Sequence, residues 1–301
     1  MQETENKTDQ GKNSLISSGK LREKYGGDMY TLQELQKLIR QDIIRMTSAA
    51  KSGHPGGSLS AVEILTLLYF EIMHIDPLCP KMEDRDKFVL SKGHAAPALY
   101  ATLARRGFFD IEELVTLRRL GSRLQGHPDM HALEGIEIGT GSLGQGISAA
   151  VGMALAQKLD GLQRYVYVLV GDGELNEGIV WEATMAAAHN QLNNLIILVD
   201  ENGLQIDGAT CDVMNLGDLV KKFEAFGCNA VFVEDGHDYD QLRKAIQTAQ
   251  TVQDRPSAIV CKTVKGKGVS FMENNPSWHG KASNEEQTRQ ALAELEAYAN
   301  G

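Results

Sequence analysis

The sequence predicts an α/β protein built on a doubly wound, mostly parallel sheet with helices on both faces. Strand-like and helix-like segments alternate along the 301 residues, as repeated βα units require. The strand-like segments, such as RYVYVLV and NLIILVD, are near-continuous apolar runs, which is typical of strands buried on both faces. Ligands of such sheets bind beyond the carboxyl ends of the strands, so the residues directly after each strand are the candidates for chemistry.

The first third of the chain is mainly helical. TLQELQKLIRQDIIRMTSAAK and SAVEILTLLYFEIM both carry apolar residues three and four positions apart, which indicates helices. The turn SGHPGGS separates them. KFVLSKGHAAPALYATLARRG then predicts a short strand, a turn and a helix, and GTGSLGQGISAAVGMALAQKLDG predicts a glycine-rich loop that leads into a helix.

The rest of the chain continues the alternation. The strand RYVYVLV precedes the helix GIVWEATMAAAHNQL, and the strand NLIILVD ends in ENGLQIDG. CNAVFVEDG, DYDQLRKAIQTAQ and SAIVCKTVK predict a further strand, helix and strand. No convincing linker interrupts this part, so we expect one domain over residues 28–301, preceded by a polar arm at residues 1–27.

Composition excludes several classes of function. The net charge of −10 argues against nucleic-acid binding, which needs a basic patch. No apolar run approaches the roughly 20 residues of a membrane helix, and the first 27 residues lack the apolar core of a signal peptide. The cysteines are scattered without a C-x-x-C motif, so we expect a reducing compartment and a cytoplasmic location.

An acidic residue stands between two glycines where one apolar strand ends. Asp172 in VGDGE follows the strand directly, and a helix starts soon afterwards. The glycines allow a tight turn, and a helix N-terminus suits phosphate. A phosphate beside Asp172 needs a bridging cation, and Mg²⁺ takes oxygen ligands from carboxylates and phosphates. Asn202 in VDENG ends the next strand. Each segment alone could be a cap or a turn, but the pair favours a metal site.

The same residues carry a family resemblance. GDGELNEG…VDENG resembles the thiamine diphosphate fingerprint, a G-D-G followed by roughly 25–30 residues and an asparagine. KSGHPGGSLSAVEIL, LSKGHAAPALYATL, QGHPDM, GTGSLGQGISAAVGMA and KTVKGKG resemble the N-terminal half of transketolase, in the same order. The resemblance runs from about residue 30 to residue 285.

The resemblance implies how thiamine diphosphate and Mg²⁺ are bound. Asp172, Asn202 and the Leu204 carbonyl would hold the metal against the diphosphate, and the loop at Gly141 would face the aminopyrimidine ring. The family usually has proline where this chain has Ser142, which would make that loop less rigid. The implied cofactor-binding residues are Gly141, Ser142, Leu143, Asp172, Gly173, Glu174, Asn202, Leu204 and Ile206.

Histidine usage points to substrate handling. Glycine precedes four of the eight histidines, where about one is expected by chance. The resemblance assigns His54 and His279 to proton transfer with hydroxyls and oxyanions, His94 to the cofactor and a donor hydroxyl, and His127 to the donor's C1 hydroxyl. Imidazoles with a pKa near 6.5 suit such tasks. The family pattern after the last of these histidines is H-G-x-P, whereas this chain reads WHGKAS.

The implied reaction is transfer of a two-carbon ketol unit from a ketose or ketose phosphate to an aldose or aldose phosphate. A full transketolase is about twice this length, and its second half binds the pyrimidine ring. We therefore expect a separate C-terminal subunit, in a heterotetramer with two copies of each chain (α₂β₂). Glu177 and Glu182 would reach the dimer interface, although a solvated helix face also explains them.

Two other functions compete with this one. The α subunit of a 2-oxo acid dehydrogenase is also a separate chain with a GDG…N signature, but SGHPGG and SKGHAAPALYATL fit sugar handling better. A non-catalytic module that keeps only the fold is disfavoured by the Asp172–Asn202 pair and the four histidines. Ordinary pentose-phosphate sugars are the default substrates, and a branched or sulfonated ketose would leave little trace in this half.

Overall fold

The computed structural model describes residues 30–206 and 208–298, so the expected arm at residues 1–27 lies outside the described residues. Five parallel strands form the central sheet of the described part, in the order β1-β2-β3-β7-β6. All five coincide with the strands expected from the sequence, which confirms the α/β fold class. The strands are β1 (Lys87–Leu90), β2 (Val166–Gly171), β3 (Leu195–Glu201), β6 (Asn229–Val233) and β7 (Ser257–Lys262).

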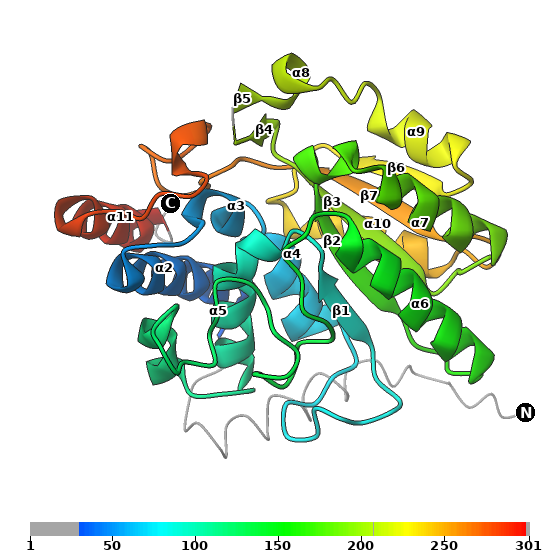
Figure 1. Cartoon of the computed structure of the whole chain (residues 1–301), viewed down its shortest axis with the longest axis horizontal. Coiled ribbons are helices and arrows are strands. Elements are labelled where there is room, and N and C mark those ends of the chain that lie inside the picture. The colour runs from blue at the N-terminus through cyan, green and yellow to red at the C-terminus, as the bar shows by residue number, and fades with distance from the viewer. Residues whose placement is uncertain (1–29, 207, 299–301) are drawn as a thin grey trace, which may run out of the picture.

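Helices cover both faces of this sheet (Figure 1). On one face lie α2 (Leu32–Ala50), α4 (Val62–Leu67), α5 (Ala96–Arg106), α10 (Tyr239–Gln250) and α11 (Glu285–Tyr298). On the other lie α6 (Gln145–Leu159), α7 (Gly178–His189) and α9 (Leu219–Ala225). The shorter elements are α3 (Pro55–Leu59), the π-helix η1 (Leu68–Ile72), the 3₁₀ turns η2 (Gly93–Ala95), η3 (Ile111–Thr116), η4 (Gly173–Asn176) and η5 (Pro276–Trp278), α8 (Thr210–Val213), and the hairpin β4 (Leu204–Gln205)–β5 (Gly208–Ala209).

Strands β1, β2, β3 and β7 are largely buried because both of their faces are covered, whereas the edge strand β6 is only partly buried. Side chains of a strand alternate between the two faces, and in β2 Tyr167 and Leu169 join one core cluster while Val166, Val168 and Val170 join the other. The strand order also explains why α10 does not lie on the same face as α6, α7 and α9. The chain moves in one direction across the sheet from β1 through β2 and β3 to β6, and it then moves back to β7. Because crossovers between parallel strands are right-handed, this reversal places α10 on the other face of the sheet.

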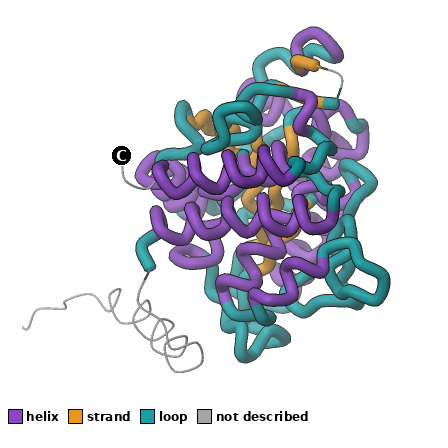
Figure 2. Tube along the Cα trace, turned by 90° about the vertical axis from the view of Figure 1, so that its left-hand side faces the viewer, coloured by secondary structure: helices purple, strands orange, loops and turns teal. Residues whose placement is uncertain are grey.

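Helices α2 and α11, far apart in sequence, lie side by side in front of the sheet (Figure 2). A capping box begins α2, because the Thr31 hydroxyl accepts from the Glu34 amide at 3.2 Å while the Glu34 carboxylate accepts from the Thr31 amide at 2.7 Å. In the described part of the chain, none of the helices has the length and apolar character needed to cross a membrane.

The register of the sheet places the chemically unusual residues together. Gly171 pairs with Asp200, and Asp200 pairs with Cys261 on the next strand. Because these strands are parallel, the turns that follow β2, β3 and β7 leave the same edge of the sheet. The candidate site is built on this edge.

Candidate active site

The expected metal ligands meet where β2 and β3 end. The Asp172 carboxylate accepts from its neighbour's amide, Gly173 N, at 2.8 Å and from Gly203 N at 2.6 Å. It therefore lies against the turn that carries Asn202 and Leu204. Within that turn the Asn202 side-chain oxygen accepts from Leu204 N at 3.2 Å, an Asx-turn contact.

This set of donors fits Mg²⁺. A carboxylate, an amide oxygen and a backbone carbonyl are hard oxygen ligands of the kind that Mg²⁺ binds together with phosphate oxygens. Asp172 is only 3% exposed, and it has no ion-pair partner among the described residues. Burial and the nearby Asp200 carboxylate raise the pKa of Asp172 to about 6. A bound cation would supply the missing positive charge.

A buried ion pair lies behind these ligands. Asp200 at the end of β3 accepts from Lys92 Nζ and Thr263 Oγ1, from Ser60 Oγ at 2.6 Å and from Asn202 Nδ2 at 3.3 Å. Asp200 and Lys92 are at most 1% exposed, and buried charges persist only when they are paired and hydrogen-bonded. Because a carboxylate only accepts, it binds the amide nitrogen of Asn202 and turns the amide oxygen away from itself.

Glu174 points into the protein. The residue is 2% exposed, and its carboxylate accepts from Ser91 Oγ, from Gly144 N at 2.8 Å and from Gly171 N at 3.0 Å. Glu174 therefore ties together the turn after β1, the glycine-rich loop and the end of β2. These contacts give it a supporting position behind the expected cofactor site, while direct cofactor contact stays a prediction.

The glycine-rich loop packs against two histidine-bearing turns. A Cβ atom at Gly141, where φ is +148°, would lie 3.1 Å from Cγ of His127. A Cβ atom at Gly93, next to His94, would lie 2.6 Å from the Thr140 hydroxyl. Glycine at both positions allows the loop to approach the two histidines closely.

Other expected cofactor residues lie around this core with varying exposure. Ser142 is exposed, and Leu143 is partly buried on the same loop. Gly173 begins η4 directly after Asp172. Ile206 is 69% exposed next to the β4–β5 hairpin. Their contacts with a cofactor remain predictions.

The structure brings the four expected histidines into one cluster from four separate segments. Ring centroids of His54 lie 5.5 Å from those of His94 and His279 and 6.3 Å from that of His127. The rings of His94 and His279 are 5.0 Å apart. Residues separated by more than 200 positions in sequence thus share one site.

The environment of these histidines favours the neutral imidazole. Burial, followed by the charge of Arg118, lowers the pKa of His54 to about 4. Burial and Lys265 lower the pKa of His279 to about 3. Burial is also the main cause that lowers the pKa of His94 and of His127. Local sequence does not reveal this burial beside cations, which is the physical cause of the lowered pKa values.

Lys265 links the histidine cluster to the metal ligands. Its Nζ donates to the Leu204 carbonyl at 3.1 Å and lies 3.0 Å from Nδ1 of His279. Burial and Lys92 lower its pKa to about 8. Sequence reasoning did not single out either lysine, although they stand in LSKGH and KTVKGKG, two of the motifs that carry the resemblance.

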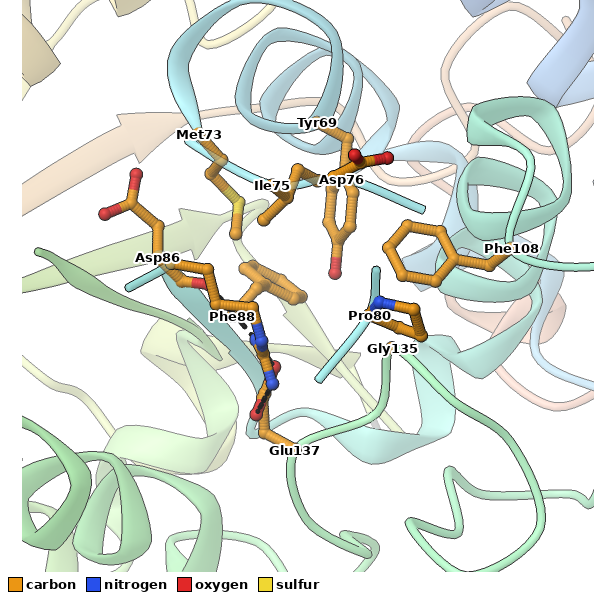
Figure 3. A pocket seen from close by; sticks show the side chains of 11 residues that line it. Tyr69, Met73, Ile75, Asp76, Pro80, Asp86, Phe88, Phe108, Gly135 and Glu137 are labelled. Carbon is orange, nitrogen blue, oxygen red and sulfur yellow. Dashed lines mark hydrogen bonds and ion pairs between the residues drawn. The ribbon is translucent and has the colours of Figure 1, made fainter. Parts of the chain in front are cut away.

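A separate small cavity lies near the start of β1, at the opposite end of that strand from His94 (Figure 3). Tyr69 and Phe108 face it, and an Arg85–Glu137 ion pair borders it. Its volume of about 10 Å³ has room for one water molecule at most. It is too small for a sugar or a cofactor.

Known proteins resemble this chain over nearly its full length. The family described as "Transketolase, thiamine diphosphate binding domain" matches residues 32–297. A 6-deoxy-6-sulfo-D-fructose transketolase subunit from Clostridium sp. is 46% identical over 88% of this chain and 96% of its own length. One subunit of an apulose-4-phosphate transketolase from Phocaeicola vulgatus is 41% identical over 88% of this chain and 94% of its own length.

Other, longer transketolases match this chain over less than half of their own length. Human transketolase is 42% identical over 89% of this chain but only 42% of its own length. The solved structure of transketolase from Leishmania mexicana superposes with a TM-score of 0.83 and 31% identity, over 91% of this chain and 45% of that one. From the family match, the fold and these relatives, the chain belongs to the transketolase family and contains that family's thiamine diphosphate-binding domain.

Proposed function

We propose that this chain is the N-terminal subunit of a two-chain transketolase that moves a two-carbon ketol unit from a ketose or ketose phosphate to an aldose or aldose phosphate. The observation that carries the proposal is the placement of four histidines beside the oxygen ligands at one edge of the sheet. A site that only bound a cofactor would not need the cluster, whereas reactions at sugar hydroxyls do.

The metal and diphosphate would be held at the ends of β2 and β3. Asp172, Asn202 and the Leu204 carbonyl would bind Mg²⁺, and the Gly173 amide would donate to a phosphate oxygen. The loop at Gly141–Leu143 would face the aminopyrimidine ring, and Ile206 would pack near the thiazolium ring. When bound, thiamine diphosphate would supply the nucleophilic carbon that cleavage and formation of the sugar C–C bond require.

The protein's own part in the reaction is to position the sugar and handle its protons. A neutral imidazole carries one N–H donor and one acceptor nitrogen, so the cluster can both hold hydroxyls and accept protons. His127 would hold the C1 hydroxyl of the donor, and His94 would contact a donor hydroxyl close to the cofactor. His54 and His279 would stabilise oxyanions and exchange protons with hydroxyls of the sugar.

A separate C-terminal subunit would complete the site, most simply in an α₂β₂ assembly. Support comes from the relatives named as subunits, of which this chain spans 94–96%. Helix α7 also carries an exposed apolar side chain that a partner could cover, because Met185 is 57% exposed. Obligate interfaces are large and apolar.

Reconstitution tests this assembly. The purified chain alone should show no ketol transfer, and addition of the C-terminal subunit should restore it. Robust transfer by the highly purified chain alone would refute the two-chain proposal.

A panel of donors tests the reaction and its substrates. The assembled enzyme should use ketoses and not decarboxylate pyruvate, whereas pyruvate turnover without ketol transfer would support the 2-oxo acid dehydrogenase alternative. The panel should contain xylulose 5-phosphate, 6-deoxy-6-sulfo-D-fructose and apulose 4-phosphate. The last two sugars are included because two relatives are named after them. We propose that the donor belongs to this ketose class, and rejection of all three would contradict that.

A further inference from the structure

Arg118 occupies an unusual backbone position beside the histidine cluster. It follows η3 and precedes the QGHP motif, and its φ of +59° lies in the left-handed region. Its amide donates to the Leu124 carbonyl at 2.8 Å. A residue other than glycine is uncommon in this region and persists where surrounding contacts hold it.

The guanidinium of Arg118 joins two of the segments that carry histidines. One amino group donates to Ser52 Oγ at 2.9 Å, and the other lies 3.4 Å from both Nδ1 of His54 and the Gly126 carbonyl. Ser52 and His54 belong to the SGHP turn, and Gly126 directly precedes His127. A Cβ atom at Gly126 would lie 3.1 Å from the guanidinium, so glycine makes room for this contact.

The chemistry of arginine determines the direction of its contact with His54. A guanidinium stays protonated and can only donate. The nitrogen that it faces, Nδ1 of His54, must therefore accept and carry no proton. Burial, Arg118, His127 and Lys265 all lower the pKa of His54, so the ring is neutral near pH 7. A neutral ring without a proton on Nδ1 carries its proton on Nε2.

The Nε2 edge of His54 faces the segment that carries His279. A Cβ atom at Gly280, next to His279, would lie 3.6 Å from this nitrogen. Apart from burial, the causes that lower the pKa of its ring are the nearby Arg118, His127 and Lys265. The titratable and charged groups around it are Arg118, Lys265, His94, His127 and His279.

We infer that Arg118 is a positioning residue that fixes the Nε2-protonated tautomer of His54, so that His54 presents an N–H donor to a substrate oxygen. In this form His54 stabilises developing negative charge on that oxygen before it takes part in any proton transfer. The catalytic meaning of this inference rests on the proposed function, but the tautomer itself does not.

The test compares Arg118→Met with Arg119→Met, an exposed neighbour whose side chain forms no hydrogen bond or ion pair within the described part of the chain. Long-range proton–nitrogen NMR on the full chain, with isotope-labelled histidine, reports which ring nitrogen carries the proton, and His54→Gln assigns the signal. The wild-type chain and Arg119→Met should show Nε2 protonated and Nδ1 unprotonated. Arg118→Met should show a mixture of tautomers and a His54 titration that moves to higher pH, because one nearby cation is gone.

Kinetics of the enzyme assembled with its C-terminal subunit give the second measurement. Arg118→Met should lower kcat by roughly tenfold to a hundredfold, as misplaced catalytic groups do, with a smaller effect on KM. Arg118→Lys should recover part of this loss, and Arg119→Met should match wild type. A wild-type His54 protonated on Nδ1, or an Arg118→Met spectrum unchanged from wild type, would overturn the inference. The expected spectra without ketol transfer would instead contradict only the proposed function.

Discussion

Replacement of Glu174 by glutamine disturbs the hydrogen bonds through which one carboxylate holds three turns of the site together. The carboxylate accepts from Ser91 and Gly144 on one oxygen and from Gly171 on the other. Glutamine can keep its carbonyl on the first pair, but its NH₂ group then faces the Gly171 amide, donor against donor. Glutamine is close in volume to glutamate, so the substitution tests hydrogen bonding and charge rather than packing.

The expected loss of stability follows from these contacts. Leaving one buried donor unsatisfied costs about 1–3 kcal/mol, and Glu174→Gln leaves two, the Gly171 amide and the new NH₂ group. We therefore expect the free energy of unfolding to fall by about 2–4 kcal/mol, once the partial relaxation of the turn is allowed for. The affinity for thiamine diphosphate with Mg²⁺ should fall as well, because the same carboxylate aligns the glycine-rich loop with the end of β2.

Urea unfolding and calorimetric titration of the cofactor measure the two effects. Both should be done at pH 8, because burial raises the pKa of Glu174 and a protonated carboxyl would resemble the amide. The matched control is Glu224→Gln, an exposed glutamate on α9, which should change stability by less than about 0.5 kcal/mol. If Glu174→Gln proves as stable as this control, the donor-against-donor argument is wrong.

Three further predictions address the metal ligand, the glycine-rich loop and the histidines. Asp172→Asn should weaken Mg²⁺-dependent binding of thiamine diphosphate by more than about a hundredfold in calorimetric titration. Substitution of a residue that only hydrogen-bonds to a metal ligand already lowers metal affinity by about 10–100-fold. An unchanged affinity would show that the metal does not bind at this turn. Gly144→Ala should lower the free energy of unfolding by about 3 kcal/mol, from left-handed backbone strain and overpacking, because φ is +84° and the new Cβ would lie 2.4 Å from Ile179. Its control is Gly152→Ala, which meets no atom within 4 Å and should be slightly stabilising in urea, by about 0.5–1 kcal/mol; equal effects of the two substitutions would contradict the steric argument. The pKa of His54 falls from 6.5 in the unfolded chain to about 4 in the folded one. Between these pH values the unfolded state binds more protons than the folded state, so the stability that His54 contributes at higher pH is lost as the pH drops from 6.5 to 4. His54→Gln should therefore lose less stability than wild type between pH 6.5 and 4 in urea unfolding, and an identical loss would argue against a neutral buried ring.

Local patterns in the sequence were enough to predict the fold. A strand buried on both faces has to be apolar at successive positions, so β1, β2, β3 and β7 could be located from their continuous apolar runs. The edge strand β6 is only partly buried, but its apolar run NAVFV located it as well. Parallel strands also place their following turns at one edge. That is why Asp172 and Asn202 could be paired in advance, and the structure does bring their turns together.

Other parts of the site could not be predicted because their partners are distant in sequence. Lys92 and Asp200 form a fully buried ion pair across 108 positions, and Lys265 meets Leu204 across 61. A lysine in a loop motif looks like a surface residue until the fold removes it from water. The inward orientation of Glu174 is invisible for the same reason, because its partners lie on other turns.

The sequence by itself determined the strands, the order of the motifs and the side chains available for chemistry, because these depend on local periodicity and residue type. Only the tertiary structure decided which groups lose their hydration and which meet a cation. That is why it alone gave the lowered pKa of the clustered histidines and the contact of Arg118 with His54. The protonation state of a group depends on its burial and on its distance from other charges. Neither of these two quantities can be read from the residues next to it in sequence.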